Sequence, residues 1–108
     1  MGKRQEKMNE LLARLAAQFF SVSSGTHSLI TVTRVSTSSD FKKATVYFTV
    51  IPTDKENDAL LFANRKRSDL REYVKKHTNL KFLPFFDIEI DLGEKNRQKI
   101  DTLLEIKK

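Results

Sequence analysis

The chain has 108 residues, no cysteine, and no apolar run near the roughly 18 residues that a membrane-spanning helix needs. Its length allows one domain, and the missing cysteines exclude disulfides, thiol nucleophiles and thiolate metal sites. Lys and Arg number 20 against 14 Asp and Glu, a formal charge of +6, which favours a nucleic acid, an anionic membrane or an acidic protein as partner. The charged start does not resemble a signal peptide, so we expect a cytoplasmic location.

The first predicted element is an amphipathic helix over residues 3–20. Its apolar residues recur three and four positions apart, as on one face of a helix: Met8, Leu11, Leu12, Leu15, Phe19 and Phe20. Residues 21–28, which are rich in Ser, have the composition of a loop. Basic side chains off the apolar stripe are candidates for phosphate contact: Lys3, Arg4 and Lys7.

Two strands are predicted next, at residues 29–37 and 43–51, joined by a turn at residues 38–41 into an antiparallel hairpin. The first strand alternates imperfectly, which indicates a β-bulge. The second alternates cleanly, with Ala44, Val46, Phe48 and Val50 on one face and Thr45, Tyr47 and Thr49 on the other. The hairpin adds further candidates for phosphate contact: Arg34, Lys42 and Lys43.

A helical pattern over residues 53–77 is interrupted in its middle. The pattern is long against a mean helix of about 11–12 residues, and its apolar stripe stops at Lys66 and Arg67. We therefore predict two helices or one kinked helix. Thr53 and Glu56 match a capping box at the start, and Ser68-Asp69 is a candidate cap for the second piece.

The last predicted elements are a strand over residues 82–92 and a helix over about residues 95–106. The strand would direct Phe86, Ile88, Ile90 and Leu92 to one side, and the acidic residues Asp87, Glu89 and Asp91 to the other. The uneven order of strands and helices predicts an α+β class, with a small three-stranded mixed sheet and helices packed on one face. Its other face would be wet and acidic.

The basic residues between positions 65 and 76 form the densest cationic segment of the chain. They are the main candidates for phosphate contact: Arg65, Lys66, Arg67, Arg71, Lys75 and Lys76. Such contacts act by counterion release, which gives affinity without reading sequence. The alternative interpretation is an ordinary solvated helix face.

Enzyme chemistry is less well supported. The three carboxylates of the last strand suggest a Mg²⁺ nuclease only if a further carboxylate joins them, and His27 and His77 have no partner at metal or catalytic spacing. We therefore expect no catalytic residue, no metal and no cofactor. The acidic face is unsuited to stacking bases, so we expect RNA on the helical side. Phe82, Phe85 and Phe86 are predicted to pack in the core or at the strand edge.

The element order, α-β-β-α-kink-α-β plus a short C-terminal helix, resembles the type II KH fold. Three segments resemble the ribosome-binding factor A family in order and spacing, and together with the first helix they extend the likeness from Arg4 to Leu104: ITVTRVSTSSDFKKATVYFTV, NRKRSDLREYVKKHTNLKFLPFFDIEID and GEKNRQKIDTLL. Where the family has Ala-x-Gly at the kink, this chain has Lys66-Arg67-Ser68.

The resemblance implies a single KH-like ribosome-binding domain over residues 1–108. Members of the family are non-enzymatic factors that mature the small ribosomal subunit, bind its rRNA, support processing of the rRNA 5′ end and matter most in the cold. The implied partners are therefore the small subunit and its rRNA, with the protein as a monomer and no membrane. A basic protein-interaction module of similar fold, without a ribosomal role, is the alternative.

Overall fold

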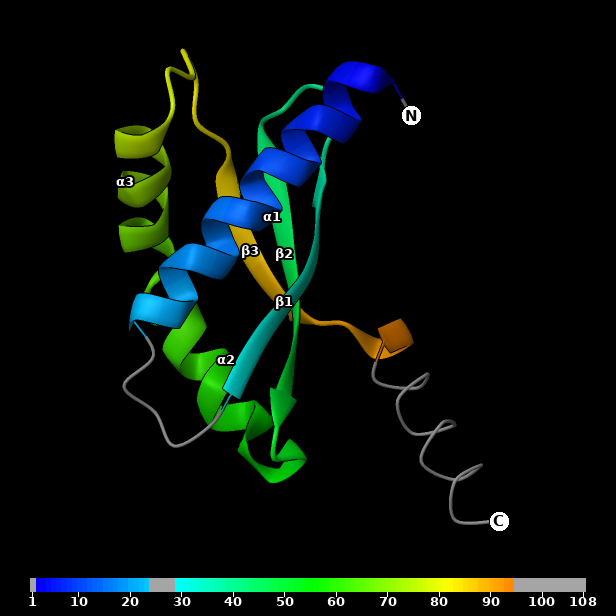
Figure 1. Ribbon diagram of the computed structural model, residues 1–108, viewed down its shortest axis with the longest axis vertical. Helices are drawn as coiled ribbons and strands as arrows, with labels where there is room; N and C mark the ends of the chain where they lie inside the picture. Colours follow the sequence, from blue (N-terminus) through cyan, green and yellow to red (C-terminus); the bar gives the residue numbers. More distant parts are fainter. Residues whose placement is uncertain (1, 24–28, 95–108) are drawn as a thin grey trace.

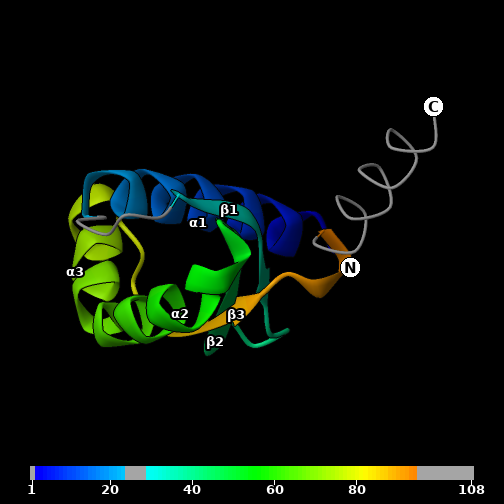
Figure 2. The same ribbon diagram turned by 90° about the horizontal axis from the view of Figure 1, so that it is seen from below.

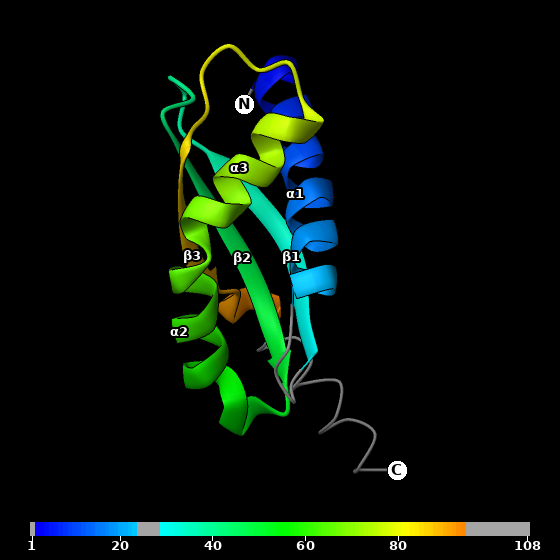
Figure 3. The same ribbon diagram turned by 90° about the vertical axis from the view of Figure 1, so that its left-hand side faces the viewer.

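The computed structural model describes residues 2–23 and 29–94. Its three strands form one mixed sheet in the order β1-β2-β3, and the helices cover one face of it (Figures 1 and 3). The elements, in chain order, are α1 (Lys3–Ser23), β1 (Leu29–Thr37), β2 (Lys43–Ile51), the 3-10 turn η1 (Thr53–Lys55), α2 (Glu56–Arg65), α3 (Arg67–His77) and β3 (Phe85–Ile90). This confirms the predicted α+β class and its type II KH-like order.

The hairpin has the predicted bounds and the predicted bulge. β1 and β2 pair antiparallel, and the register shifts between Val32 and Arg34, so that Thr33 is the extra residue. In the connecting turn the Phe41 N–H donates to the Ser38 carbonyl at 2.9 Å. Phe41 has φ +60°, a left-handed conformation that is uncommon for residues with a side chain.

β3 pairs with β2 in parallel, from Lys43 opposite Phe85 to Phe48 opposite Ile90. Pro84 has no N–H to give to a ladder, so the pairing begins at Phe85, whose N–H donates to the Lys42 carbonyl at 2.9 Å. The predicted strand over residues 82–92 was therefore too long at both ends. The predicted helix over residues 95–106 lies outside the described residues.

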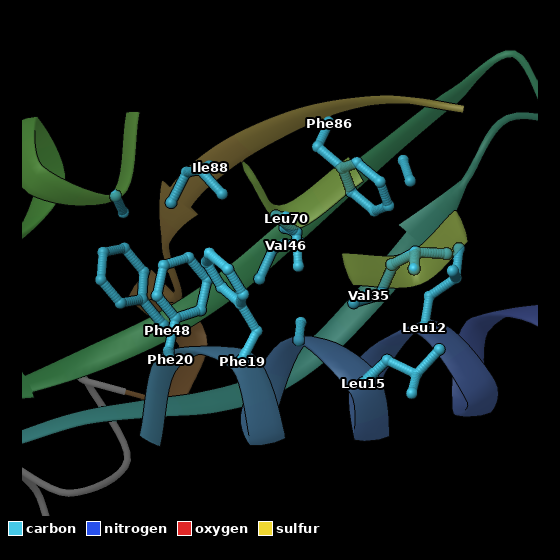
Figure 4. Packing of buried hydrophobic residues seen from close by; sticks show 14 of the residues in the cluster. Leu12, Leu15, Phe19, Phe20, Val35, Val46, Phe48, Leu70, Phe86 and Ile88 are labelled. Atoms are coloured by element: carbon cyan, nitrogen blue, oxygen red, sulfur yellow. The ribbon is translucent and has the colours of Figure 1, made fainter. Parts of the chain in front are cut away.

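The core lies between the inner face of the sheet and the three helices, which curve around that face when the molecule is seen from below (Figure 2). Phe48 of β2 is fully buried, and its ring stacks on that of Phe20 from α1 at 6.5 Å between centroids (Figure 4). Leu70 and Val74 of α3 are also fully buried and belong to the same core. The predicted inward face of β2 is confirmed: Ala44, Val46, Phe48 and Val50. Thr49, predicted to face water, is buried as well.

Two predicted helix boundaries were wrong. α1 continues to Ser23, so residues 21–23 are helical and not part of the predicted loop. At the start of α2, Thr53 is not the cap of an α-helix. It is the first residue of the 3-10 turn, Pro52 holds the cap position without a side-chain bond, and the α-helix begins only at Glu56.

The predicted break in the long helix is confirmed at one residue. α2 ends at Arg65 and α3 begins at Arg67, with Lys66 between them at φ −96° and ψ +5°. This is the bridge region, which residues with a side chain can enter, so the turn needs no glycine. Lys66, and not Ser68 as predicted, is the cap residue of α3, and it makes no side-chain cap bond.

Replacing Phe48 with Ala should lower the free energy of unfolding by about 3–5 kcal/mol, because a fully buried ring is lost and a cavity remains. Urea denaturation followed by circular dichroism measures the change. Phe82→Ala is the matched control, since that ring is exposed and its loss should change stability by less than about 0.5 kcal/mol. Equal effects of the two substitutions would contradict the inward facing of β2.

Candidate nucleic-acid interface

Three of the predicted basic residues share one flank of α3. Arg67, Arg71 and Lys75 recur four positions apart, which places them on the same side of a helix. That side faces β3, since Arg67 Nη1 lies 3.5 Å from Asp87 Oδ1 and Arg71 Nη2 donates to the Leu83 carbonyl at 3.3 Å. We call these three residues the α3 flank.

A small cavity of about 290 Å³ separates the start of α3 from β3. Its lining is mainly cationic and aromatic: Arg67, Ser68, Arg71, Phe85, Phe86 and Asp87. The Arg71 guanidinium carbon lies 5.0 Å from the centre of the Phe85 ring, and the Arg71 Nε has no hydrogen-bond partner within the described structure. The Nε is buried, so Arg71 is anchored against β3 through its Nη2 and the Phe85 ring.

The other three predicted residues of this segment do not join the flank. Arg65 ends α2 and is exposed. Lys66 is only partly exposed, lies 3.7 Å from the Asp69 carboxylate and sits over the Phe62 ring. Lys76 projects from the side of α3 opposite the buried Leu70 and Val74, by its helical spacing. The sequence cluster is thus divided over several faces.

A larger hollow lies at one end of the molecule, and we call it the end groove. The start of α1, the turn between β1 and β2, and the connection from α3 to β3 meet there, as both side views show (Figures 1 and 3). Its volume is about 810 Å³. Its lining mixes aliphatic, aromatic and basic side chains: Arg4, Met8, Asp40, Phe41, Lys42, Lys43, Leu80, Lys81, Phe82, Leu83 and Phe85.

The end groove brings together Arg4, Lys42 and Lys43, which the sequence placed on separate elements as candidates. Lys81 joins them and was not predicted. Its neighbourhood carried a signal in Pro84, because a proline ends the β ladder and leaves the residues before it in a connection. Lys81 and Phe82 therefore belong to a loop beside the hairpin turn and not to a strand.

The prediction that all three phenylalanines pack was wrong for two of them. Phe86 is buried, as predicted, but the exposed fractions of Phe82 and Phe85 are 82% and 69%. Phe82 precedes the strand, so no ladder directs it inward. Phe85 is the first residue of β3 and points opposite to Phe86, because successive strand residues alternate between faces. Two large apolar rings thus remain on the surface at the end groove.

Asp40 is the carboxylate among the residues that line the end groove. The Ser38 hydroxyl donates to Asp40 Oδ1 at 2.7 Å and the Lys42 N–H donates to the same atom at 3.1 Å. The Ser38 hydrogen bond, followed by that of the Lys42 N–H, lowers the pKa of Asp40. The Asp40 carboxylate therefore stabilises the turn that carries Lys42.

The remaining predicted basic residues lie apart from both cavities. Lys3 and Lys7 are exposed on α1, and Lys7 borders a separate hollow with Glu10 and Arg14. Arg34 is on the outer face of the sheet, with its guanidinium 3.8 Å from the centre of the Tyr47 ring and its Nε 3.5 Å from Asp91 Oδ2. These contacts give Arg34 a structural role.

Asp91 is not a solvated residue of an acidic strand face, as predicted, but a buried carboxylate with 6% of its surface exposed. β3 ends at Ile90, so the alternation stops there, and Leu92 is exposed where an inward position was predicted. The hydroxyl of the bulge residue Thr33 donates to Asp91 Oδ2 at 2.6 Å, and the Glu94 N–H donates to Oδ1 at 3.0 Å. The Thr33 hydrogen bond, above all, lowers the pKa of Asp91.

Residues 2–23 and 29–94 contain neither a cluster of metal-ligating side chains nor a helix that could span a membrane. No three His, Asp or Glu side chains there converge as a metal site would require. None of the helices in those ranges has the length and apolar character needed to cross a membrane.

Comparison with known proteins places this chain in a family. The family model for ribosome-binding factor A matches residues 4–104. The chain belongs to the ribosome-binding factor A family. Proteins named ribosome-binding factor A from Geotalea uraniireducens and Geobacter metallireducens are 29% and 28% identical to it, over 97% of this chain and 88% and 92% of theirs.

Solved structures share the fold. The crystal structure of ribosome-binding factor A from Thermus thermophilus superposes with a TM-score of 0.74 at 21% identity, over 80% of this chain and 93% of that one. The solution structure of a Thermotoga maritima protein gives 0.58 at 22% identity, over 79% and 80%. At these identities the likeness concerns the fold, and it confirms the family's arrangement of helices and sheet here.

The Asp91 carboxylate should make the stability of this ribosome-binding factor A family member depend on acid pH. Folding lowers the pKa of Asp91, so the unfolded chain binds the proton more readily and stability rises with pH. The contribution should be complete above about pH 4, the unfolded value, and lost as the pH falls through the lower folded value. Urea denaturation of the wild type and Asp91→Asn at pH 7 and at acid pH measures it.

We expect Asp91→Asn to be less stable than the wild type at pH 7 and the difference to shrink as acid protonates Asp91. Asp54→Asn, at an exposed carboxylate, is the control for loss of charge alone. A difference between Asp91→Asn and the wild type that stays constant with pH would contradict a titrating hydrogen bond between Thr33 and Asp91.

Proposed function

We propose that this protein binds the small ribosomal subunit through its rRNA and acts in the cytoplasm as a monomeric, non-enzymatic factor of subunit assembly. The observation that carries the proposal is the alignment of Arg67, Arg71 and Lys75 along one flank of α3 in a fold of the ribosome-binding factor A family. Relatives across the whole length of the chain carry the name ribosome-binding factor A. We extend the proposal to support of rRNA 5′-end processing and of growth in the cold.

The mechanism is electrostatic holding of one rRNA conformation. The α3 flank offers guanidinium groups, which are planar and match two phosphate oxygens at once, on a rigid helix. Arg67 faces Asp87, an ion pair with both partners about half exposed, which contributes little to stability and can open to admit a phosphate. Each phosphate neutralised releases counterions, so binding should weaken steeply with salt.

The positions at the helix break should matter for this binding. We expect Lys66→Glu with Arg67→Glu to weaken co-sedimentation with isolated small subunits and to lower the slope of log affinity against log salt by about 1 to 2, because up to two phosphate contacts are lost. The fold should persist, since Arg67 is exposed and Lys66 partly so. Circular dichroism checks this.

Arg14→Glu with Lys55→Glu is the matched control. It makes the same change of net charge at exposed positions away from both the α3 flank and the end groove. Equal losses in the two variants would show that binding follows net charge and would remove the helix break from the site. Absence of small-subunit binding by the wild type at low salt would instead favour a basic protein-interaction module.

A further inference from the structure

We propose that the end groove binds an unpaired base of single-stranded RNA, stacked on Phe82, with the neighbouring phosphates held by Lys42, Lys43 and Lys81. The inference rests on the proposed function in taking RNA as the partner. It adds a second subsite of different chemistry, because the α3 flank contacts phosphates whereas the end groove contacts a base.

The first argument is the exposure of aromatic surface. Phe82 and Phe85 are the two most exposed of the large apolar side chains among the described residues, and both line the same groove. Met8, Leu80 and Leu83 also line the groove and are partly buried against the core, so the apolar part of the lining extends beyond the two rings. A flat apolar ligand would cover this surface, and every nucleic-acid base has such a face.

The second argument is charge. Arg4, Lys42, Lys43 and Lys81 also line the groove, whereas the carboxylate of Asp40 is engaged by the Ser38 hydroxyl and the Lys42 N–H. An apolar protein partner would leave these cations without counterparts. A nucleotide matches both parts of this lining, since its flat base can cover the aromatic rings and its anionic phosphate can pair with the basic side chains.

The same chemistry favours a single strand over a duplex. In a duplex both faces of each base are covered by its neighbours, so a phenyl ring on the protein surface can stack only on a base that has left the helix. The groove volume of about 810 Å³ is also within the range of roughly 300–1,000 Å³ typical of small-ligand sites, which suits one base with its sugar.

The end groove and the α3 flank adjoin one another. Phe85 lines both the end groove and the small cavity beside α3, and the Arg71 guanidinium lies over its ring at 5.0 Å from the centroid. A strand whose phosphates contact Arg67 and Arg71 therefore has the groove directly beside it. One RNA strand can use both surfaces in succession.

The test uses the full chain and an unstructured RNA hexamer that carries 2-aminopurine at a central position, since the fluorescence of this base is quenched when it stacks. We expect the wild type to bind the hexamer with quenching. Phe82→Ala should weaken the affinity about fivefold or more and abolish the quenching, because stacking on the ring is lost. Phe82→Tyr, which keeps a flat ring, should restore both. Leu61→Ala, at an exposed apolar residue of α2 outside the groove, is the control.

One outcome would overturn the inference and leave the proposed function standing. It is wild-type protein that sediments with small subunits but binds the hexamer without quenching, or with an affinity that Phe82→Ala does not change. A dimer that Phe82→Ala converts to a monomer would also overturn the inference, because it would assign the groove to a second copy of the chain, and it would contradict the proposed monomeric state. If the wild type does not bind small subunits at all, the proposed function fails together with the inference.

Discussion

The structure depends on the inner face of β2. This strand is paired on both sides, antiparallel with β1 and parallel with β3, and its inward residues Ala44, Val46, Phe48 and Val50 are almost completely buried. α1 packs on it through Phe20, whose ring stacks on Phe48, and Leu70 and Val74 of α3 complete the core. Every surface discussed above is held by elements that pack directly or indirectly on this strand.

The parallel pairing of β2 with β3 explains where the end groove lies. Parallel strands begin at the same end of a sheet, so the turn before β2 and the connection before β3 must meet. Register brings Lys43 opposite Phe85, which sets Lys42 and Lys43 beside Phe82 and Phe85. The start of α1 lies at the same end and adds Arg4. A groove with basic and aromatic lining thus follows from topology.

The break between α2 and α3 shows how this chain forms the turn without a glycine. Lys66 adopts a bridge-region conformation that any residue with a side chain can reach, so Lys66-Arg67-Ser68 occupies the position where the resemblance led us to expect Ala-x-Gly. The substitution places basic side chains at the turn. Two of them face carboxylates, Asp69 and Asp87, through exposed ion pairs that a phosphate can replace at small cost.

The residues at the bulge in β1 contact the segment that follows β3, and they do not line the proposed RNA surfaces. Thr33, the extra residue, donates its hydroxyl to Asp91, and Arg34 approaches the same carboxylate. Sequence alone placed Arg34 among the phosphate-binding candidates and Asp91 on a wet acidic face. The placement of Asp91 was wrong, because β3 ends at Ile90 and the chain after it turns toward the bulge. Phosphate contact by Arg34 stays a prediction.

The local pattern of apolar and polar residues determined several secondary-structure elements of this protein. Residues rich in Thr, Val and Ile predicted the first strand of the hairpin, and clean alternation predicted the second, both with the bounds observed. The imperfect alternation of the first strand predicted the bulge, and the interrupted apolar stripe predicted the break at Lys66, because each of these is a property of residues close in sequence. The order of elements, with the resemblance of residues 4–104, indicated the family. Tertiary structure alone decided which basic residues meet. Lys42, Lys43 and Lys81 come together because strand pairing brings distant segments to one end, and the packing of α1 adds Arg4. Phe82 is exposed there because Pro84 ends the ladder before reaching it.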